Sequence, residues 1–167
     1  GVITGSPTIK NGVTTNGSTQ LISYGDVGNL GDNDFTINLK VSFPSLVQTY
    51  IISKWQDNNN RWYVRRETAG QVFLYCLVGG AIQISAVSGV SLTTANKVYD
   101  ISIVADKSDT IKFYVDGVQS TGSVSTFLNT NINNTGNLEV GRASTSYGAF
   151  TLNDLTIHDT ALSTDEV

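Results

Sequence analysis

Apolar and polar residues alternate along most of the chain, and the clearest run lies between Asp34 and Pro44. Every second residue in that run is apolar: Phe35, Ile37, Leu39, Val41 and Phe43. Successive side chains of a β-strand point to opposite faces of a sheet, so this period predicts a strand with one buried and one solvated face. Pro44 cannot donate a hydrogen bond to a neighbouring strand, so we expect the strand to end there.

Shorter runs with the same alternation follow, separated by residues that favour turns. Further strands are expected over residues 50–55, 61–66, 71–78, 81–87, 98–105, 110–115, 138–142 and 150–158. Residues 68–70 are expected to join two strands as a hairpin, and Asp116-Gly117 to form a tight turn. At residues 153–154 the apolar positions change parity, which predicts a β-bulge.

The parity within each strand also predicts which side chains are buried. Ile82 and Ile84 are expected on one face of their strand. The expected core comprises Phe35, Ile37, Leu39, Val41, Ile101, Ile103, Ile111, Phe113, Val115, Leu155 and Ile157. Many short strands with regular turns and no convincing helix favour an all-β sandwich or barrel.

Composition narrows the classes of function. Charged residues make up only 14% of the 167 residues, the net charge is −4, and the ten Lys and Arg residues are scattered. Nucleic-acid binding normally needs a basic patch or stripe, so no nucleic-acid partner is expected. No apolar run approaches the length that spans a bilayer, so no membrane insertion is expected.

The single cysteine and the first residues add two expectations. Cys76 cannot form an internal disulfide, and it shares the parity of Val72 and Leu74, so we expect it in the core. The chain begins Gly1-Val2 and contains no Met. We therefore expect one domain over residues 1–167 that is excised from a larger protein.

Three segments resemble a known family. They are Tyr114-Val115-Asp116-Gly117 at the end of a strand pair, the closing stretch of residues 152–167, and Asp34-Phe35-Thr36-Ile37 at the first long strand. These segments are similar to the laminin-G-like domains of the concanavalin A-like lectin and glucanase superfamily. The resemblance implies a two-sheet antiparallel jelly-roll β-sandwich with one concave sheet, and a role in binding glycans or proteins.

Some members of that superfamily hydrolyse glycans, usually with carboxylates on alternate residues of one strand. The three glutamates here are Glu67, Glu139 and Glu166, and none has an acidic residue two positions away. Glycoside hydrolysis normally needs two carboxylates at one bond, so no enzyme activity is expected. His158, the only histidine, is expected on the surface of a sheet.

Calcium is bound at the rim of some relatives. Residues 26–34 are rich in the oxygen ligands that Ca²⁺ prefers, with Asp26, Asp32 and Asp34 among them. Asp and Gly at this density also form ordinary turns. Both interpretations stay open, and no cofactor is required by the sequence.

Aromatic residues on the strands over 61–66 and 71–78 indicate where a ligand would bind. If the strands pair in sequence order, one outer face carries Tyr63, Arg65, Phe73, Tyr75, Gln83 and Ser85. Aromatic rings pack on the apolar faces of sugars, while Arg and Gln can hydrogen-bond to hydroxyls. Trp55 is expected at the rim of this face. The face is alternatively covered by a loop or a neighbouring domain.

These features predict a non-catalytic carbohydrate-binding module for a glycan or cell-surface polysaccharide. The alternative is a structural or adhesive domain of a phage virion or bacterial surface protein, in which the same face contacts another chain. In both cases an extracellular or virion-surface location is expected.

Overall fold

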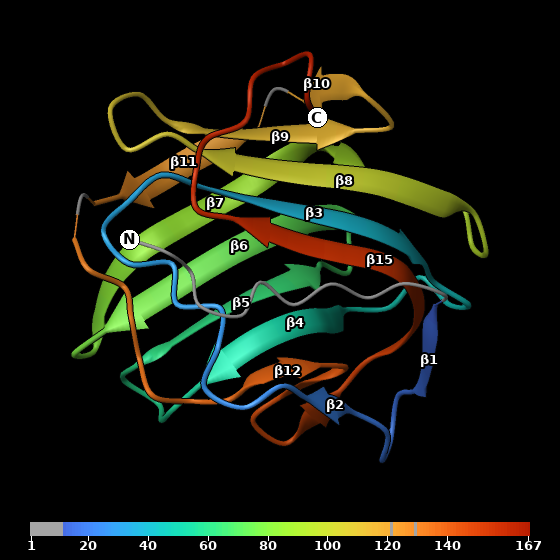
Figure 1. Ribbon diagram of the computed structural model, residues 1–167. Coiled ribbons are helices and arrows are strands. Elements are labelled where there is room, and N and C mark those ends of the chain that lie inside the picture. The colour runs from blue at the N-terminus through green and yellow to red at the C-terminus, as the bar shows by residue number, and fades with distance from the viewer. Residues whose placement is uncertain (1–11, 121, 129) are drawn as a thin grey trace.

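Two antiparallel β-sheets pack face to face in the computed structural model, which describes residues 12–120, 122–128 and 130–167. The view in Figure 1 looks onto one sheet with the second behind it. The predicted antiparallel jelly-roll sandwich is confirmed. Residues 1–11 of the predicted domain, including Gly1-Val2, lie outside the described residues.

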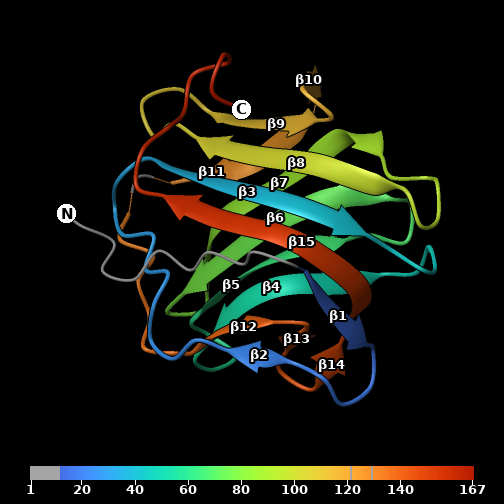
Figure 2. The same ribbon diagram turned by 45° about the vertical axis from the view of Figure 1, so that its right-hand side comes forward.

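The six-stranded sheet joins strands from both ends of the chain. In spatial order it contains β1 (Val13–Asn16), β15 (Ala149–His158), β3 (Phe35–Ser42), β8 (Val98–Ala105), β9 (Ile111–Val115) and β10 (Val118–Ser120). The long strand predicted after Asp34 is β3, and it lies between β15 and β8 in the middle of the sheet (Figure 2).

The seven-stranded sheet is built around a meander of four consecutive strands. In spatial order it contains β11 (Ser123–Phe127), β7 (Ala81–Ser91), β6 (Gln71–Val78), β5 (Arg61–Arg66), β4 (Thr49–Trp55), β12 (Leu138–Val140) and β2 (Ile22–Ser23). Part of the strand predicted over residues 138–142 forms a separate small hairpin, made of β13 (Arg142–Ala143) and β14 (Ser146–Tyr147).

The space between the sheets is filled by the inward-facing residues of both. All eleven predicted core residues are buried, as is Cys76. Ile37 of β3 pairs with Ile103 of β8 and Ile157 of β15, and Trp62 and Leu74 of the other sheet belong to the same cluster. Each such side chain contributes about 1.5–3 kcal/mol by leaving water, so this layer stabilises the sandwich.

Several strand pairings contain register shifts, and two of these shifts concern residues whose burial was predicted. The predicted bulge is confirmed, because the pairing of β15 with β3 shifts between Leu152 and Asp154 and keeps both Leu152 and Leu155 buried. A second shift lies between β6 and β7. It turns Ile84 inward and leaves Ile82 43% exposed, so the prediction that both share one buried face is wrong.

The predicted turns are also present. Asp116 and Gly117 connect β9 to β10 with φ angles of 53° and 74°, the left-handed region that a two-residue hairpin turn needs. The hairpin between β5 and β6 is formed, and Gly70 within it has a φ of 94°. The described part of the chain contains no helix that is long and apolar enough to cross a bilayer.

Candidate functional site

The outer face of the seven-stranded sheet carries a cluster of aromatic rings and arginines. It forms because β4, β5 and β6 pair in sequence order, so that the outward-facing side chains of directly paired residues lie side by side. Tyr63 pairs with Tyr75, Arg65 with Phe73 and Tyr50, and Arg61 with Trp55. We call this surface the aromatic platform, and it consists of Tyr50, Trp55, Arg61, Tyr63, Arg65, Phe73 and Tyr75.

Tyr63 is the centre of the platform. Its ring centroid lies 5.1 Å from that of Tyr50, 5.4 Å from Tyr75, 6.2 Å from Phe73 and 6.4 Å from Trp55. These separations are those of packed aromatic pairs. Burial raises the pKa of the Tyr63 phenol to about 12, so the phenol is neutral at physiological pH.

Arg65 fills the space between three of these rings. Its guanidinium carbon lies 5.1 Å from the ring centroid of Phe73, 5.2 Å from Tyr63 and 5.5 Å from Tyr50. Its Nε donates to Glu67 Oε1 at 2.7 Å, and its Nη1 donates to the Tyr50 hydroxyl at 3.0 Å. The side chain is therefore held in one position by contacts on several sides.

Arg61 lies at the other end of the platform. Its guanidinium carbon is 4.5 Å from the centroid of the Trp55 ring, and its Nη1 donates to the backbone oxygen of Asn58. Trp55 in turn stacks on Tyr63, with 15° between the ring planes. Trp55, which was predicted at the rim, therefore contacts the central ring of Tyr63 directly.

Five of the six residues predicted from the sequence lie on the platform, but one of them is less accessible than expected. Tyr63 is only 6% exposed, because the rings around it cover it. Trp55, Arg65, Phe73 and Tyr75 are half-buried. The ligand-accessible part of the platform is therefore the ring of residues around Tyr63.

Gln83 does not join the others. It lies at the register shift between β6 and β7, and the residue that pairs with Tyr75 is Ser85. The Gln83 side chain accepts a hydrogen bond from the Thr130 hydroxyl at 2.6 Å and donates to the Ala81 carbonyl at 3.2 Å. Strict alternation predicted Gln83 beside the aromatic rings. The register shift leaves Gln83 without a paired residue in β6, so its side chain does not lie on the platform.

Sequence reasoning missed Tyr50 and Arg61. For Arg61 the signal was present, because pairing across the loop of residues 56–60 sets it opposite Trp55. Tyr50 has the opposite parity to Trp55, and it lies opposite Arg65 only because the pairing of β4 with β5 shifts between Tyr50 and Ile52. Glu67 was noted only for its lack of acidic neighbours, whereas in the structure it is the ion-pair partner of Arg65, with 2.6 Å between Arg65 Nη2 and Glu67 Oε1.

In the acidic loop of residues 26–34, two of the three aspartates, Asp26 and Asp34, accept hydrogen bonds from the protein's own donors. Asp26 Oδ1 lies 2.5 Å from the ammonium nitrogen of Lys54, whose side chain is fully buried. The Lys54 ammonium holds the pKa of Asp26 below its usual range. Asp34 accepts the backbone N–H of Lys107 at 2.7 Å. Within the described residues no group of three or more His, Cys, Asp or Glu side chains could hold a metal ion.

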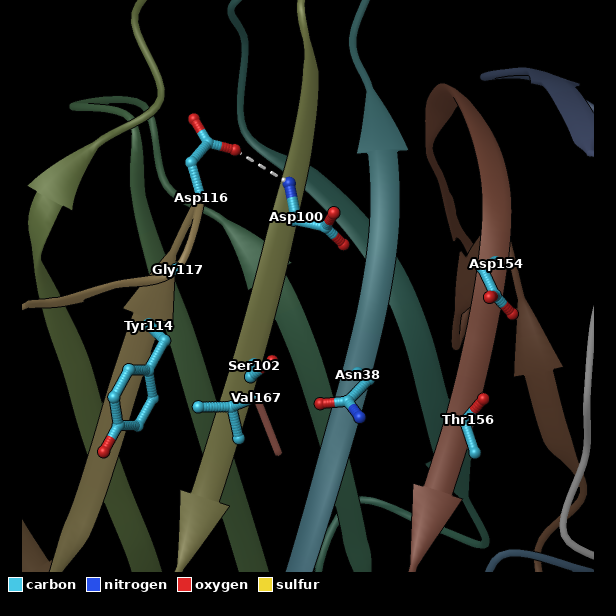
Figure 3. Close-up of a pocket in the computed structure, with 9 residues that line it drawn as sticks. All are labelled: Asn38, Asp100, Ser102, Tyr114, Asp116, Gly117, Asp154, Thr156 and Val167. Atoms are coloured by element: carbon cyan, nitrogen blue, oxygen red, sulfur yellow. Dashed lines mark hydrogen bonds between the residues drawn. The ribbon is translucent and has the colours of Figure 1, made fainter. Parts of the chain in front are cut away.

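The outer face of the six-stranded sheet has a polar groove of about 570 Å³ that the sequence did not predict. Figure 3 shows it between β15, β3, β8 and β9, lined by Asn38, Asp100, Ser102, Tyr114, Asp116, Gly117, Asp154, Thr156 and Val167. Asp100 pairs with Lys40 at 3.1 Å and Asp116 with Lys97 at 2.7 Å. His158 lies on the same outer face of β15, 3.4 Å from the Asn38 amide.

The groove and the platform differ in what they offer a ligand. Tyr114, the only ring in the groove lining, is 4% exposed, so the groove presents carboxylates, hydroxyls and an amide. The platform combines apolar ring surface with a few fixed polar groups, as small-ligand sites usually do. We therefore place the candidate site on the platform.

Comparison with known proteins agrees with this architecture. The model of a family described as the concanavalin A-like lectin/glucanases superfamily matches residues 16–167. No curated protein sequence matches the chain.

Several solved structures share the fold at low sequence identity. The CBM40 of the Ruminococcus gnavus IT-sialidase, bound to α2,3-sialyllactose, has a TM-score of 0.72 and 16% identity, with 97% of this chain and 96% of that chain covered. The Streptococcus pneumoniae NanB sialidase has a TM-score of 0.69 and 14% identity over 93% of this chain, which spans 27% of the sialidase. The binding domain of botulinum neurotoxin serotype G has a TM-score of 0.67 and 16% identity over 96% of this chain and 45% of that one.

Proposed function

Because the chain belongs to the concanavalin A-like lectin/glucanases superfamily, we propose that it is a non-catalytic carbohydrate-binding module that holds its glycan on the aromatic platform. The observation that carries this proposal is the cluster of five aromatic rings, four of them around Tyr63, on the outer face of the seven-stranded sheet. A sandwich core does not require these rings, since they point away from it.

The platform offers the two kinds of contact that a sugar needs. Half-buried Trp55, Phe73 and Tyr75 provide apolar surface for the C–H faces of a pyranose, and each ring is already fixed by its neighbours. Little conformational entropy is then lost when a ligand binds, which favours affinity. The Tyr75 hydroxyl can donate a hydrogen bond to a sugar hydroxyl and accept one from it.

Two features favour binding without catalysis. Glu67 and Glu139, which flank the platform, are each in an ion pair with an arginine, at 2.6 Å and 2.5 Å. These carboxylate oxygens contact the protein's own arginines, whereas the two carboxylates of a glycosidase must face the bond that is cleaved. The fold is also shared with the CBM40 structure in complex with sialyllactose. We propose that the platform binds glycans without cleaving them.

We also propose a setting for the module. A domain that binds a glycan or cell-surface polysaccharide acts where such polymers are exposed, so we place it outside a cell or on a virion as part of a larger protein. A protein domain or subunit is the second class of partner for the same face. One observation favours that second candidate: Ile82 is 43% exposed and pairs with Leu77 beside Arg61, which extends the platform with aliphatic surface.

The proposal is tested by replacing Tyr75 with alanine. A glycan array first identifies a ligand, and calorimetry then measures its affinity. Tyr75→Ala should weaken binding by about 1–3 kcal/mol, or roughly 5–150-fold, the range of an aromatic anchor at an interface. The bound glycan should release no reducing ends during the experiment.

Asp154→Ala in the polar groove is the matched control and should leave the affinity unchanged. The proposal is wrong if Asp154→Ala weakens binding while Tyr75→Ala does not, since the glycan would then lie on the six-stranded sheet. It is also wrong if no glycan on the array binds the protein.

A further inference from the structure

We infer that the aromatic platform selects neutral glycans over anionic ones, and that Glu67 is the residue that sets this preference. The inference rests on the proposed function, and it concerns the chemistry of the ligand. It differs from what the sialyllactose complex of the CBM40 structure would suggest, because Arg65, which lies between three rings of this platform, already has a counter-ion.

All three guanidinium nitrogens of Arg65 have partners within the chain. Nε and Nη2 contact Glu67 Oε1 at 2.7 Å and 2.6 Å, and Nη1 donates to the Tyr50 hydroxyl at 3.0 Å. An arginine recognises a carboxylate through two parallel N–H groups. Glu67 occupies that edge of the guanidinium, so a ligand carboxylate cannot form the same pair without displacing Glu67.

Glu67 is itself fixed in place. Its second oxygen, Oε2, accepts a hydrogen bond from Gln48 Nε2 at 2.8 Å. The side chains of Arg65 and Glu67 are 19% and 22% exposed, so water screens their charges only partly. A ligand anion above Arg65 would therefore meet the negative charge of Glu67 at close range, and the net charge at that point of the platform is zero.

Arg142, near the platform, is also paired with a carboxylate of the chain. Arg142 forms a two-point contact with Glu139, with Nε–Oε2 at 2.8 Å and Nη2–Oε1 at 2.5 Å. Arg61 covers the Trp55 ring, and its Nη1 donates to the Asn58 carbonyl. With a chain net charge of −4, the surface as a whole favours uncharged ligands.

The test compares neutral and anionic oligosaccharides directly. Cellohexaose, xylohexaose, mannohexaose and lactose are measured beside hexagalacturonate and sialyllactose, by calorimetry in the same buffer. At least one neutral probe should bind, and each anionic probe should bind at least about tenfold more weakly than that neutral probe. This wild-type comparison does not depend on the folding of any variant.

Glu67→Gln keeps the shape of the side chain and removes its charge. The ratio of anionic to neutral affinity should rise at least about tenfold, and the gain should disappear as NaCl is raised. Glu166→Gln, which changes the net charge equally but lies in the C-terminal tail, should leave the ratio unchanged. An equal effect of both variants would overturn the inference, since bulk charge would explain it.

The inference and the proposed function fail in different ways. If wild-type protein binds an anionic probe at least as tightly as the neutral ones and Tyr75→Ala weakens that binding, the site is correct and the selectivity is wrong. If no probe binds, or if Tyr75→Ala has no effect on any of them, the proposed function is wrong and the selectivity falls with it.

Discussion

Replacing Phe113 with alanine is expected to lower the free energy of unfolding by about 3–5 kcal/mol, as truncation of a fully buried aromatic ring does. Phe113 lies in β9, is 1% exposed and pairs with Ile103 of β8 within the layer between the sheets. Its removal both loses apolar burial and leaves a cavity that the two stiff sheets cannot close. Urea denaturation followed by the fluorescence of the buried Trp62 measures the effect.

Lys112 provides the control on the same strand. Its side chain points outward from β9 and is 36% exposed, in a surface ion pair with Asp109. Lys112→Ala should change the free energy of unfolding by no more than about 0.5 kcal/mol. A loss below about 1 kcal/mol for Phe113→Ala, or equal losses for both variants, would mean that the buried face of β9 has been assigned incorrectly.

Lys54→Ala is expected to cost about 2–4 kcal/mol. Lys54 lies in β4 with a fully buried side chain, and its ammonium donates to the Gly136 carbonyl at 2.6 Å and to Asp26 at 2.5 Å. Alanine leaves that carbonyl without a donor and removes the buried aliphatic stem. The loss is smaller than for a fully enclosed ion pair, because the Asp26 side chain is 48% exposed and stays solvated. Lys54→Met keeps the stem and should recover about half of the loss.

The same pair makes a prediction about acid. Because Lys54 lowers the pKa of Asp26, the ion pair stabilises the fold above about pH 4 and its contribution is lost as the pH falls further, through the lowered pKa. Lys54→Met should lose this part of the pH dependence. Lys54 also supplies the positive charge that a bound Ca²⁺ would supply to Asp26, so EDTA should leave the unfolding temperature of the wild-type protein unchanged. A clear decrease with EDTA would contradict this account of the loop.

Period-two alternation predicted the parts of the fold that local pattern controls. In β3 and β9 the alternate apolar residues from Phe35 to Val41 and from Ile111 to Val115 are buried, as parity predicts. Thr36 and Tyr114 have the opposite parity and are buried as well, so parity did not predict their burial. The change of parity at residues 153–154 even located a bulge. These features need only the geometry of a single strand.

Features that depend on distant residues were not predicted. β1 and β2 are short and pair with β15 and β12, more than 100 residues away in the chain, so no local signal defines them. Ile82 and Gln83 do not lie on the faces that alternation predicted, because the pairing of β6 with β7 contains a bulge. No change of parity in the sequence indicated that bulge. Lys54 is polar, yet it is fully buried, because Asp26 and Gly136 reach it from other loops.

The candidate site shows the same division. Parity and sequential pairing brought Arg65, Phe73 and Tyr75 to one surface, and the platform contains all three. The depth of Tyr63 depended on rings from a third strand, which packed around it. The net charge of the site depended on Glu67, which shares the parity of Arg65 but lies one residue beyond the end of β5, so the strand prediction did not include it.

The two tryptophans allow the most direct test of the central claim, that a glycan binds on the platform. Trp55 is half-buried on the platform, whereas Trp62 is fully buried in the core. In a ¹H–¹⁵N correlation spectrum, addition of a glycan found on the array should move the indole signal of Trp55 and leave that of Trp62 in place. If calorimetry shows binding while the Trp55 signal stays fixed and the backbone signals of Asp100 and Ser102 move instead, the glycan lies in the polar groove and the claim is contradicted.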